Sequence, residues 1–410
     1  MRAINAAKVI AELRGQGAMS RASLVRATGL SKPTITNVVA HLETEGFLEA
    51  VTPLAVVGRT PAAAAARATH YRYRASRGSV LGIDLGADKI LLVLADLDGS
   101  ILGQHRLSTR DIRPLDPESI FTAIDAAASR LVSSASAEAQ DLLAVVVGTP
   151  GVVSPDGVVT LAPQLPGWEG LDLRDRLEGM FDCPVEIERE VALSLQAERA
   201  AGVASGVDDA LFVQLGIGVA AGILVDGRIY RGADGGAGEI GMMPLPPGVL
   251  SSATGQLGPF ESEAGGIAFE RRGRELAASA SGRRLLELAG GRPQNIDAAL
   301  VFAAVRQGDA AAAALVDDIV GYMAWGIGVL ACALNPHTVI VGGGLSRSAD
   351  LFLPRLRERV NAVAPFAPRW LVSELGDEAV VLGAVHHATD LVAATLFDAG
   401  KHRNVQRGIR

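Results

Sequence analysis

A polar stretch at residues 31 to 37 has side chains that can hydrogen bond to the edges of bases in a DNA groove. Lysine, threonine and asparagine donate or accept over a short reach, and a helix can present them along the major groove. The candidate groove contacts are Lys32, Thr34, Thr36 and Asn37. Ser31 precedes them, where its hydroxyl would cap the free N–H groups of a helix and could also touch a phosphate.

The surrounding residues predict the elements that hold this polar face. A shorter helix before Gly29 and a third helix over residues 5 to 13 complete a helix-turn-helix, in which the first helix supports the second. The alternative is a surface helical hairpin with no role in DNA binding. Apolar residues recur at helical spacing on the opposite face of the second helix: Ile35, Val38, Val39 and Leu42.

Two short strands are expected after these helices. Residues 46 to 51 are interpreted as one strand, and Val56 to Arg59 as its returning partner. Three helices and a two-stranded wing predict a winged helix-turn-helix over residues 1 to 60, with Arg59 on the wing as a DNA contact. Residues 61 to 78, rich in alanine and arginine, are interpreted as a linker with a strand that enters the next domain.

The charge of the chain is divided between its two ends. Residues 1 to 80 contain 11 Lys and Arg against 4 Asp and Glu, whereas the remaining residues contain 27 against 41. The formal net charge of -7 argues against a protein that coats nucleic acid indiscriminately. A basic N-terminal region on an acidic body fits phosphate contacts made by that region alone.

Length, cysteine content and hydropathy limit the classes to which the protein can belong. A chain of 410 residues with 49% hydrophobic content suggests two to three domains with aliphatic cores. Cys183 and Cys332 are the two cysteines, too few for a disulfide framework, and this favours a reducing cytoplasm. We expect no membrane segment, because neither a signal-peptide pattern nor a run of about 18 apolar residues is evident.

The body of the chain, from Ser79 onward, repeats one pattern. A strand, a glycine turn, a second strand, an Asp-Gly hairpin and a third strand occur at residues 80 to 107 and again at residues 209 to 230. An amphipathic helix and a further strand follow the first copy, and long alanine-rich helices occupy residues 310 to 334. The repeat predicts a duplicated α/β unit and therefore two lobes.

These motifs resemble those of the repressor, open reading frame and kinase (ROK) family, in which a winged helix is joined to a sugar-kinase-like body. The resemblance runs from Asn5 to about Leu396. Its anchors are GIDLGADKI at 82 to 90, GTPGVV at 148 to 153, LPGWEG at 165 to 170, GILVDGRIYRGADGGAGEIG at 222 to 241 and NPHTVIVGGGL at 335 to 345.

The resemblance implies an α/β fold, with the winged helix-turn-helix followed by a two-lobed actin/hexokinase-like (ribonuclease H-like) body. Lobe 1 would span residues 79 to 190 and be completed by a C-terminal helix at about 380 to 396. Lobe 2 would span residues 191 to 379, and residues 397 to 410 would form a basic tail.

Kinases with this body bind ATP through two glycine loops, and this chain changes both. The first usually reads G-x-D-x-G-G-T-K, but Ala87 and Asp88 replace the second glycine and the threonine. The second usually reads G-T-G-I-G, and here Ile217 replaces the threonine. A carboxylate repels phosphate and isoleucine lacks a hydroxyl, so we expect no catalytic residues, no cofactor and no kinase activity. The alternative is an ATP-dependent sugar kinase with an accessory DNA-binding region.

The proton-accepting carboxylate of the family lies in an N-D-x-N motif, which here reads Arg189-Glu190-Val191-Ala192. Glu190 keeps the carboxylate, while Arg189 and Ala192 replace the two asparagines. Arg189 could pair with Glu190 and close the site, or bind a phosphate or carboxylate of a ligand. The family also implies three further sugar contacts: Gln164, Glu239 and Glu261.

The family often holds a structural zinc ion with one histidine and three cysteines. Met242 stands at the position of the histidine, and none of the replacing side chains can bind zinc. We therefore expect no metal, with the loop from Leu245 to Pro259 held by packing or left mobile. The residues at the cysteine positions are Ser252, Thr254 and Pro259.

Together these features predict a cytoplasmic, DNA-binding transcriptional repressor whose inactive kinase-like body senses a small molecule. The expected partners are a double-stranded DNA operator and a sugar or sugar phosphate. A winged helix reads one half-site, so a homodimer or a dimer of dimers is also expected. A further alternative is a regulator that has lost its ligand and responds to a protein partner.

Overall fold

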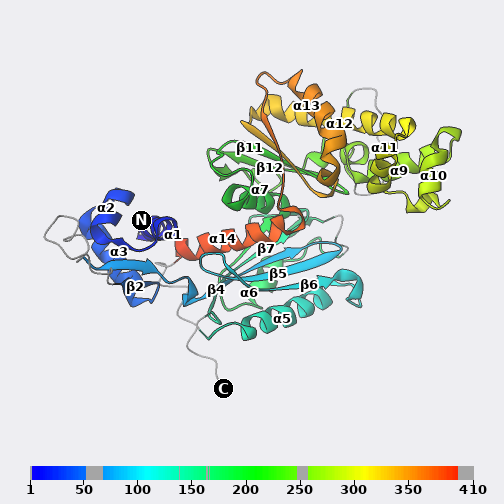
Figure 1. Cartoon of the computed structure of the whole chain (residues 1–410). Helices are drawn as coiled ribbons and strands as arrows, with labels where there is room; N and C mark the ends of the chain where they lie inside the picture. The colour runs from blue at the N-terminus through cyan, green and yellow to red at the C-terminus, as the bar shows by residue number, and fades with distance from the viewer. Residues whose placement is uncertain are drawn as a thin grey trace. The chain divides into compact units, whose positions relative to one another are not determined.

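The computed structural model describes residues 2–51, 68–137, 139–162, 165, 167–246 and 257–395. The chain divides into two compact units, each built around its own five-stranded sheet (Figure 1). Unit 1 contains Met1–Thr149, Asp172–Glu188 and Ala384–Arg410. Unit 2 contains Pro150–Leu171 and Arg189–Gly383.

Unit 1 begins with a small subdomain, here called the head, whose helices are α1 (Arg2–Gln16), α2 (Arg21–Thr28) and α3 (Lys32–Thr44). Gly29 ends α2 in the left-handed conformation, with φ of 68°. Ser31 caps α3, because its hydroxyl accepts from the backbone N–H of Thr34 at 3.3 Å. The predicted apolar face of α3 is confirmed, since four of its side chains are buried: Ile35, Val38, Val39 and Leu42.

The sheet of the head differs from the predicted wing. Its strands are β1 (Met19–Ser20), β2 (Leu48–Val51) and β3 (His70–Tyr73), in the antiparallel order β1-β3-β2. We had interpreted β3 as a strand that enters the next domain, but alternation buries Tyr71 and Tyr73 in the head. The head therefore extends to Tyr73 instead of ending at residue 60. The partner strand that we predicted, Val56 to Arg59, lies outside the described residues.

The larger part of unit 1 is a five-stranded sheet in the order β10-β7-β4-β5-β6. Strands β4, β5 and β6 form the predicted antiparallel meander, and β7 runs parallel to β4. Helix α5 packs on β5 and β6. The elements are β4 (Ser79–Leu85), β5 (Lys89–Asp96), β6 (Ile101–Ser108), α5 (Pro117–Ser134), β7 (Leu142–Thr149), α6 (Leu173–Glu178) and β10 (Val185–Arg189).

Unit 2 repeats this topology, which confirms the predicted duplication. Its sheet has the order β13-β12-β11-β14-β15, with antiparallel β11 and β12 and parallel β11 and β14. Helix α7 (Glu190–Ala201) packs against β11 and β12. The strands are β11 (Ala210–Leu215), β12 (Val219–Val225), β13 (Arg228–Ile229), β14 (Thr338–Gly342) and β15 (Arg369–Val372).

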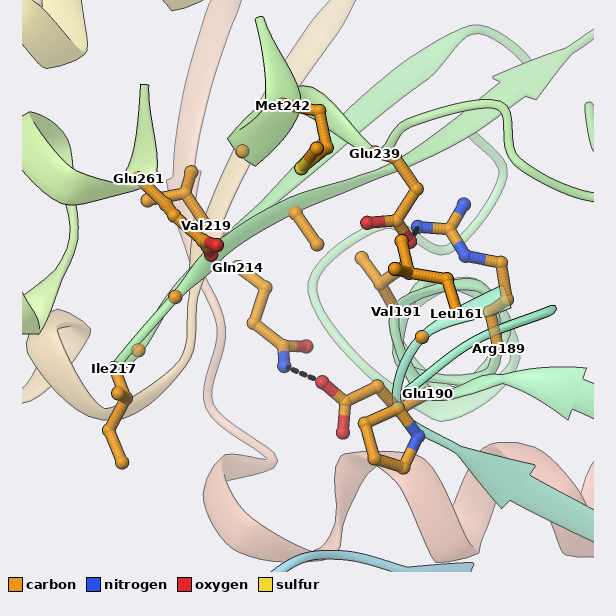
Figure 2. Close-up of a pocket in the computed structure, with 16 residues that line it drawn as sticks. Leu161, Arg189, Glu190, Val191, Gln214, Ile217, Val219, Glu239, Met242 and Glu261 are labelled. Atoms are coloured by element: carbon orange, nitrogen blue, oxygen red, sulfur yellow. Dashed lines mark hydrogen bonds and ion pairs between the residues drawn. The ribbon is translucent and has the colours of Figure 1, made fainter. Parts of the chain in front are cut away.

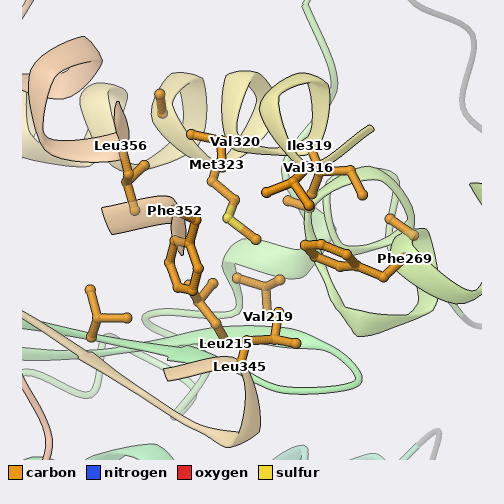
Figure 3. Close-up of a cluster of buried hydrophobic side chains, with 14 of the residues drawn as sticks. Leu215, Val219, Phe269, Val316, Ile319, Val320, Met323, Leu345, Phe352 and Leu356 are labelled. Atoms are coloured by element: carbon orange, nitrogen blue, oxygen red, sulfur yellow. The ribbon is translucent and has the colours of Figure 1, made fainter. Parts of the chain in front are cut away.

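The main core of unit 2 lies between its sheet and a layer of helices. Figure 3 shows Val316, Ile319 and Met323 of α12 directed towards Leu215 and Val219 of the sheet. Aromatic residues extend this core, since the ring centroids of Phe269 and Phe302 lie 5.0 Å apart. The helices are α8 (Glu261–Ala264), α9 (Gly266–Ala277), α10 (Arg283–Leu288), α11 (Ala298–Arg306), α12 (Ala310–Leu334) and α13 (Ala349–Asn361).

Helix α12 is the one described helix that is long and apolar enough to cross a membrane, by length and composition alone. We had expected no such segment. The helix contributes to the core of unit 2, and 56% of its most apolar window is buried there. Asp317 on the same helix forms an ion pair with Arg359 of α13 at 2.8 Å. A buried core helix passes the same test for length and composition.

The boundary between the lobes also differs from the prediction. Residues 150 to 171, which contain β8 (Val152–Val153) and β9 (Val159–Leu161), belong to unit 2 rather than to lobe 1. Gly235 lies so close to the carbonyl oxygen of Val153 that a side chain there would overlap it. Helix α14 (Ala379–Thr395) is continuous, and from Ala384 its residues belong to unit 1, as predicted for a closing helix.

Candidate functional site

The exposed face of α3 carries the predicted DNA contacts. Ser31, Lys32, Thr36 and Asn37 are exposed, and Thr34 is half-buried. The hydroxyl of Thr36 donates to the carbonyl oxygen of Lys32 at 2.9 Å, and the hydroxyls of Ser31 and Thr34 lie 2.8 Å apart. Three of the polar side chains, those of Ser31, Thr34 and Thr36, thus form hydrogen bonds within this segment, while Lys32 and Asn37 are exposed. Arg59 lies outside the described residues.

Two arginines connect the head to the larger sheet of unit 1, and local sequence spacing predicts neither contact. Nε of Arg14, on α1, lies 3.2 Å from a carboxylate oxygen of Asp98, in the turn between β5 and β6. Its guanidinium also donates to the carbonyl oxygen of Leu97 and lies over the ring of Tyr73, 5.1 Å from the centroid. Burial raises the pKa of Tyr73 to about 12. Burial also raises the pKa of Asp98, although the positive charge of Arg14 acts in the opposite direction.

The second of these arginines, Arg77, follows β3. Its Nη1 pairs with Asp141, just before β7, at 2.6 Å. Its Nε donates to the carbonyl oxygen of Glu45 at 3.2 Å, and its guanidinium lies over the ring of Phe47. Each arginine therefore joins a residue of the head to a residue beside the larger sheet. A long-range pair of this kind leaves no signal in local sequence spacing.

A cavity of about 230 Å³ in unit 2 collects most of the predicted ligand contacts. Arg189, Glu190, Glu239 and Glu261 all line it, and Figure 2 shows their side chains around the same space. They come from the end of β10, the start of α7, the segment after β13 and the start of α8. Gln164, the remaining predicted contact, lies outside the described residues.

Arg189 pairs with Glu239, which is neither of the partners that we predicted for it. Its Nη2 lies 2.5 Å from Oε1 of Glu239, and its Nη1 donates to the carbonyl oxygen of Ala237. Arg189 is 7% exposed, so its charge is largely removed from water and needs such acceptors. The ion pair fixes one of the carboxylates that the family resemblance assigns to sugar binding.

Glu190 is held by Gln214, a residue that was not among the predicted ligand contacts. Its carboxylate accepts from the side-chain amide of Gln214 at 2.6 Å, and both residues line the cavity (Figure 2). Gln214 is the one polar residue in the apolar strand β11, two positions before the turn at Gly216. That isolated polar position was the available signal. The contact orients Glu190 as an acceptor at the first turn of α7.

Glu261 and the residues near it form the far wall of the cavity. One oxygen of Glu261 accepts from the backbone N–H of Gly258 at 2.8 Å. Met242 and Ile217 line the same cavity with apolar side chains that are 49% and 58% exposed. No group of three His, Cys, Asp or Glu residues that could hold a metal occurs in the described part of the chain. Ser252 and Thr254 fall outside that part.

The first glycine loop lies in unit 1, between β4 and β5. Asp84 is buried, and its carboxylate pairs with Nζ of Lys89 at 3.3 Å. Asp88, which replaces the usual threonine, extends towards Arg110 at 3.6 Å, and both are exposed. The hydroxyl of Thr109 donates to the carbonyl oxygen of Ala87 at 2.6 Å. The loop thus carries an exposed carboxylate, Asp88, at the position where the resemblance implies a threonine.

Comparison with known proteins shows which family and which proteins this chain is similar to. Residues 80–390 match the family model described as the ROK family. A xylose repressor from Caldicellulosiruptor bescii is 26% identical over 393 residues, which cover 94% of this chain and 95% of that protein. A glucokinase from Streptomyces coelicolor is 29% identical over 328 residues, which cover 76% of this chain and 98% of the enzyme.

A solved structure of a ROK family transcriptional regulator, described as a homologue of the E. coli Mlc protein, has the same fold over nearly the full chain. It covers 96% of this chain and 98% of its own, with a TM-score of 0.78 and 20% identity. The match to the family model spans most of the chain and includes every residue that lines the cavity. The protein therefore belongs to the ROK family.

Proposed function

We propose that this protein is a DNA-binding transcriptional repressor whose kinase-like body binds a sugar or sugar derivative and thereby changes its affinity for an operator. The observation that carries the proposal is the exposed polar face of α3, with Lys32 and Asn37 projecting from a helix that Ser31 caps. A helix held in this way can enter the major groove and present short side chains to base edges. The similarity to xylose repressors over 94% of the chain supports the same interpretation.

Binding to DNA is the first test. Full-length protein should bind duplex DNA from its own promoter region more tightly than a scrambled duplex of equal length, as measured by fluorescence anisotropy. Specific sites are commonly favoured by about a thousandfold or more over non-specific DNA at physiological salt. Equal affinity for both duplexes would contradict the proposal. The experiment would also give the stoichiometry, for which we propose two heads on a symmetric operator.

Sensing is the second part of the proposal. A ligand can shift operator binding only by the difference in its affinity for the two states of the protein. The cavity beside Glu190, Glu239 and Glu261 offers oxygen acceptors for hydroxyl groups, which suits a polyhydroxylated ligand. Its volume of about 230 Å³ is below the range of drug-sized pockets and suits a single sugar ring. A sugar that binds should change the anisotropy titration with the promoter duplex.

The similarity to glucokinases favours a second candidate, a sugar kinase that also binds DNA. Phosphoryl transfer needs phosphate-binding loops and a base that accepts the sugar hydroxyl proton. Glu190 has the chemistry of such a base, whereas Asp88 and Ile217 oppose phosphate binding. A coupled assay of ATP consumption with hexoses, pentoses and amino sugars distinguishes the two candidates. Turnover that disappears in Glu190→Gln would establish the kinase, and we expect none. An operator-binding protein of this kind would act in the cytoplasm.

A further inference from the structure

The C-terminal third of α12 carries more apolar surface than unit 2 covers. Only 56% of the most apolar window of this helix is buried. Val329 and Leu334 are exposed, and the loop after α13 adds Val363 and Phe366, which are 61% and 73% exposed. Single exposed apolar side chains are ordinary, but here four large ones come from only two segments of the chain. We call these four residues the α12 patch.

The two segments of the α12 patch are packed on each other. A Cβ on Gly328 would lie 3.0 Å from Cγ2 of Val363, so the glycine lets this side chain approach the helix closely. The thiol sulfur of Cys332 lies 3.6 Å from the carbonyl oxygen of Val363. A groove of about 660 Å³ is lined by residues of both segments, and Leu334 and Phe366 line a second hollow together. The patch is therefore one continuous surface.

Acidic residues are absent from both segments, although the body of the chain is acidic. Residues 81 to 410 contain 27 Lys and Arg against 41 Asp and Glu, but none of these acidic residues lies at positions 319 to 349 or 359 to 373. Among the described residues that line the groove, Arg359 alone is charged, and it pairs with Asp317 at 2.8 Å. Charged residues are likewise depleted at the core of protein interfaces. The α12 patch thus has the composition of an interface core.

We propose that the α12 patch is the surface through which two copies of this chain form a two-fold symmetric dimer. Two copies of an acidic body repel each other over most of their surface, and this repulsion is weakest where neither copy presents a carboxylate. A two-fold axis brings the same patch of each copy together, and an apolar patch is complementary to itself. This inference rests on the proposed function, in which two heads bind one symmetric operator, because the dimer supplies the second head.

Analytical ultracentrifugation of full-length protein over a range of concentrations tests the proposal. The wild type should sediment as a dimer or as a dimer of dimers. Val363→Glu and Phe366→Glu each place a carboxylate on both sides of the interface, so the dissociation constant of the dimer should rise at least about tenfold. Ile101→Glu makes the same change at an exposed apolar residue of β6, outside the patch, and should leave that constant unchanged. A monomeric wild type, or unchanged constants in both patch variants, would overturn the proposal.

Cys332 allows a second measurement, which needs no variant. Its thiol is exposed on α12, whereas burial raises the pKa of the Cys183 thiol to about 12 and makes that cysteine unreactive. In the dimer the second copy covers Cys332. Its rate of reaction at constant maleimide concentration should therefore rise at least about tenfold when the protein is diluted below the dissociation constant. A rate that does not change on dilution would contradict the proposed surface.

Two other occupants of the α12 patch would give different results. If the patch binds a membrane, monomeric wild type will bind vesicles of phosphatidylglycerol and phosphatidylcholine, and Phe366→Glu will abolish that binding. If the patch binds a different protein, purified wild type will remain monomeric at every concentration. Either result would overturn the proposal.

DNA binding distinguishes the failure of this inference from the failure of the proposed function. The patch variants should bind a single half-site as the wild type does, but lose at least about tenfold in affinity for the full promoter duplex. Wild type that dimerises through the patch without any preference for its promoter would refute the repressor and retain the dimer. Preferential promoter binding by a monomeric wild type would refute the dimer and retain the repressor.

Discussion

Arg14 of helix α1 and Asp98 of the turn between β5 and β6 form an ion pair at 3.2 Å, 84 positions apart in the chain. The same guanidinium lies over Tyr73, the last residue of β3. This side chain of α1 thus contacts a strand of the head and a turn of the larger sheet of unit 1. The position of α3 relative to that sheet depends on this contact and on the pair between Arg77 and Asp141.

Removing the charge of Arg14 should loosen the head. Arg14→Met keeps the aliphatic stem but leaves Asp98, in its partly buried turn, without this partner. We expect the free energy of unfolding of unit 1 to fall by about 1–3 kcal/mol, with faster amide hydrogen exchange in α1. Arg26→Met, which removes an exposed arginine of α2, is the control and should change it by less than about 0.5 kcal/mol. Equal effects of both variants would contradict this role.

The two projecting residues of α3 should contribute differently to DNA binding. Lys32→Ala should weaken binding to every duplex alike. It should also reduce the magnitude of the slope of log K against log salt concentration by about one. Asn37→Ala should instead cost about 1–3 kcal/mol on the operator and little on scrambled DNA, because amides read base edges. Anisotropy titrations at several salt concentrations measure both. Glu43→Ala, exposed near the end of α3, serves as the control.

Two glycines of α12 should respond in opposite ways to alanine. A Cβ on Gly326 would overlap the ring of Phe260, so Gly326→Ala should lower the free energy of unfolding by about 1–3 kcal/mol. The nearest atom to a Cβ on Gly321 is Nη1 of Arg359 at 3.7 Å, an ordinary contact. Gly321→Ala should therefore be neutral or stabilise by up to about 1 kcal/mol through helix propensity. Chemical denaturation measures both. Phe260 precedes Glu261, so Gly326→Ala should also weaken ligand binding.

The stability of the protein should decrease in mild acid through His386. This residue of α14 lies beside the turn at Gly99, and burial lowers its pKa below 6.5, with Arg14 acting in the same direction and Asp390 opposing it. The unfolded chain therefore binds a proton more readily than the folded one. The stabilising contribution is complete above about pH 6.5 and is lost as the pH falls through the folded pKa.

Thermal unfolding between about pH 5 and pH 8 checks this prediction. The Tm of the wild type should fall more steeply below about pH 6.5 than that of His386→Gln, which cannot titrate. At about pH 8 the imidazole is neutral in both states, so any difference in Tm there reports packing alone. Parallel profiles for the two proteins would refute the role of His386.

The helices of the head could be predicted from the sequence because their signals are local. The spacing of Ile35, Val38 and Leu42 and the cap at Ser31 lie within a dozen residues. The pairing of β2 with β3 could not be predicted in this way, since the two strands are separated by a long stretch and a nearer segment competed for the same role. The alternation of Tyr71 and Tyr73 was the signal for β3, and it was interpreted as part of a linker.

The candidate pocket was predictable only in part. The resemblance to the family placed Glu190, Glu239 and Glu261 in one site, and the structure brings them around one cavity. The partner of Arg189 was not predictable, because Glu239 lies 50 positions away and Glu190 is adjacent. Two adjacent residues at the start of a helix point in different directions, so proximity in sequence misled the prediction. Gln214 lies in a strand, where one polar residue among apolar neighbours is easily overlooked.

Helix α14 has a consequence for how the chain matures on the ribosome. Its residues from Ala384 onward belong to unit 1, and Val385, Ala388 and Val392 are buried there, yet they are synthesised after all of unit 2. Unit 1 therefore cannot be completed until about two hundred further residues have been synthesised, and part of its apolar surface stays exposed until then. At typical rates of synthesis that interval lasts on the order of ten seconds or more, and chaperones could bind the exposed apolar surface during it.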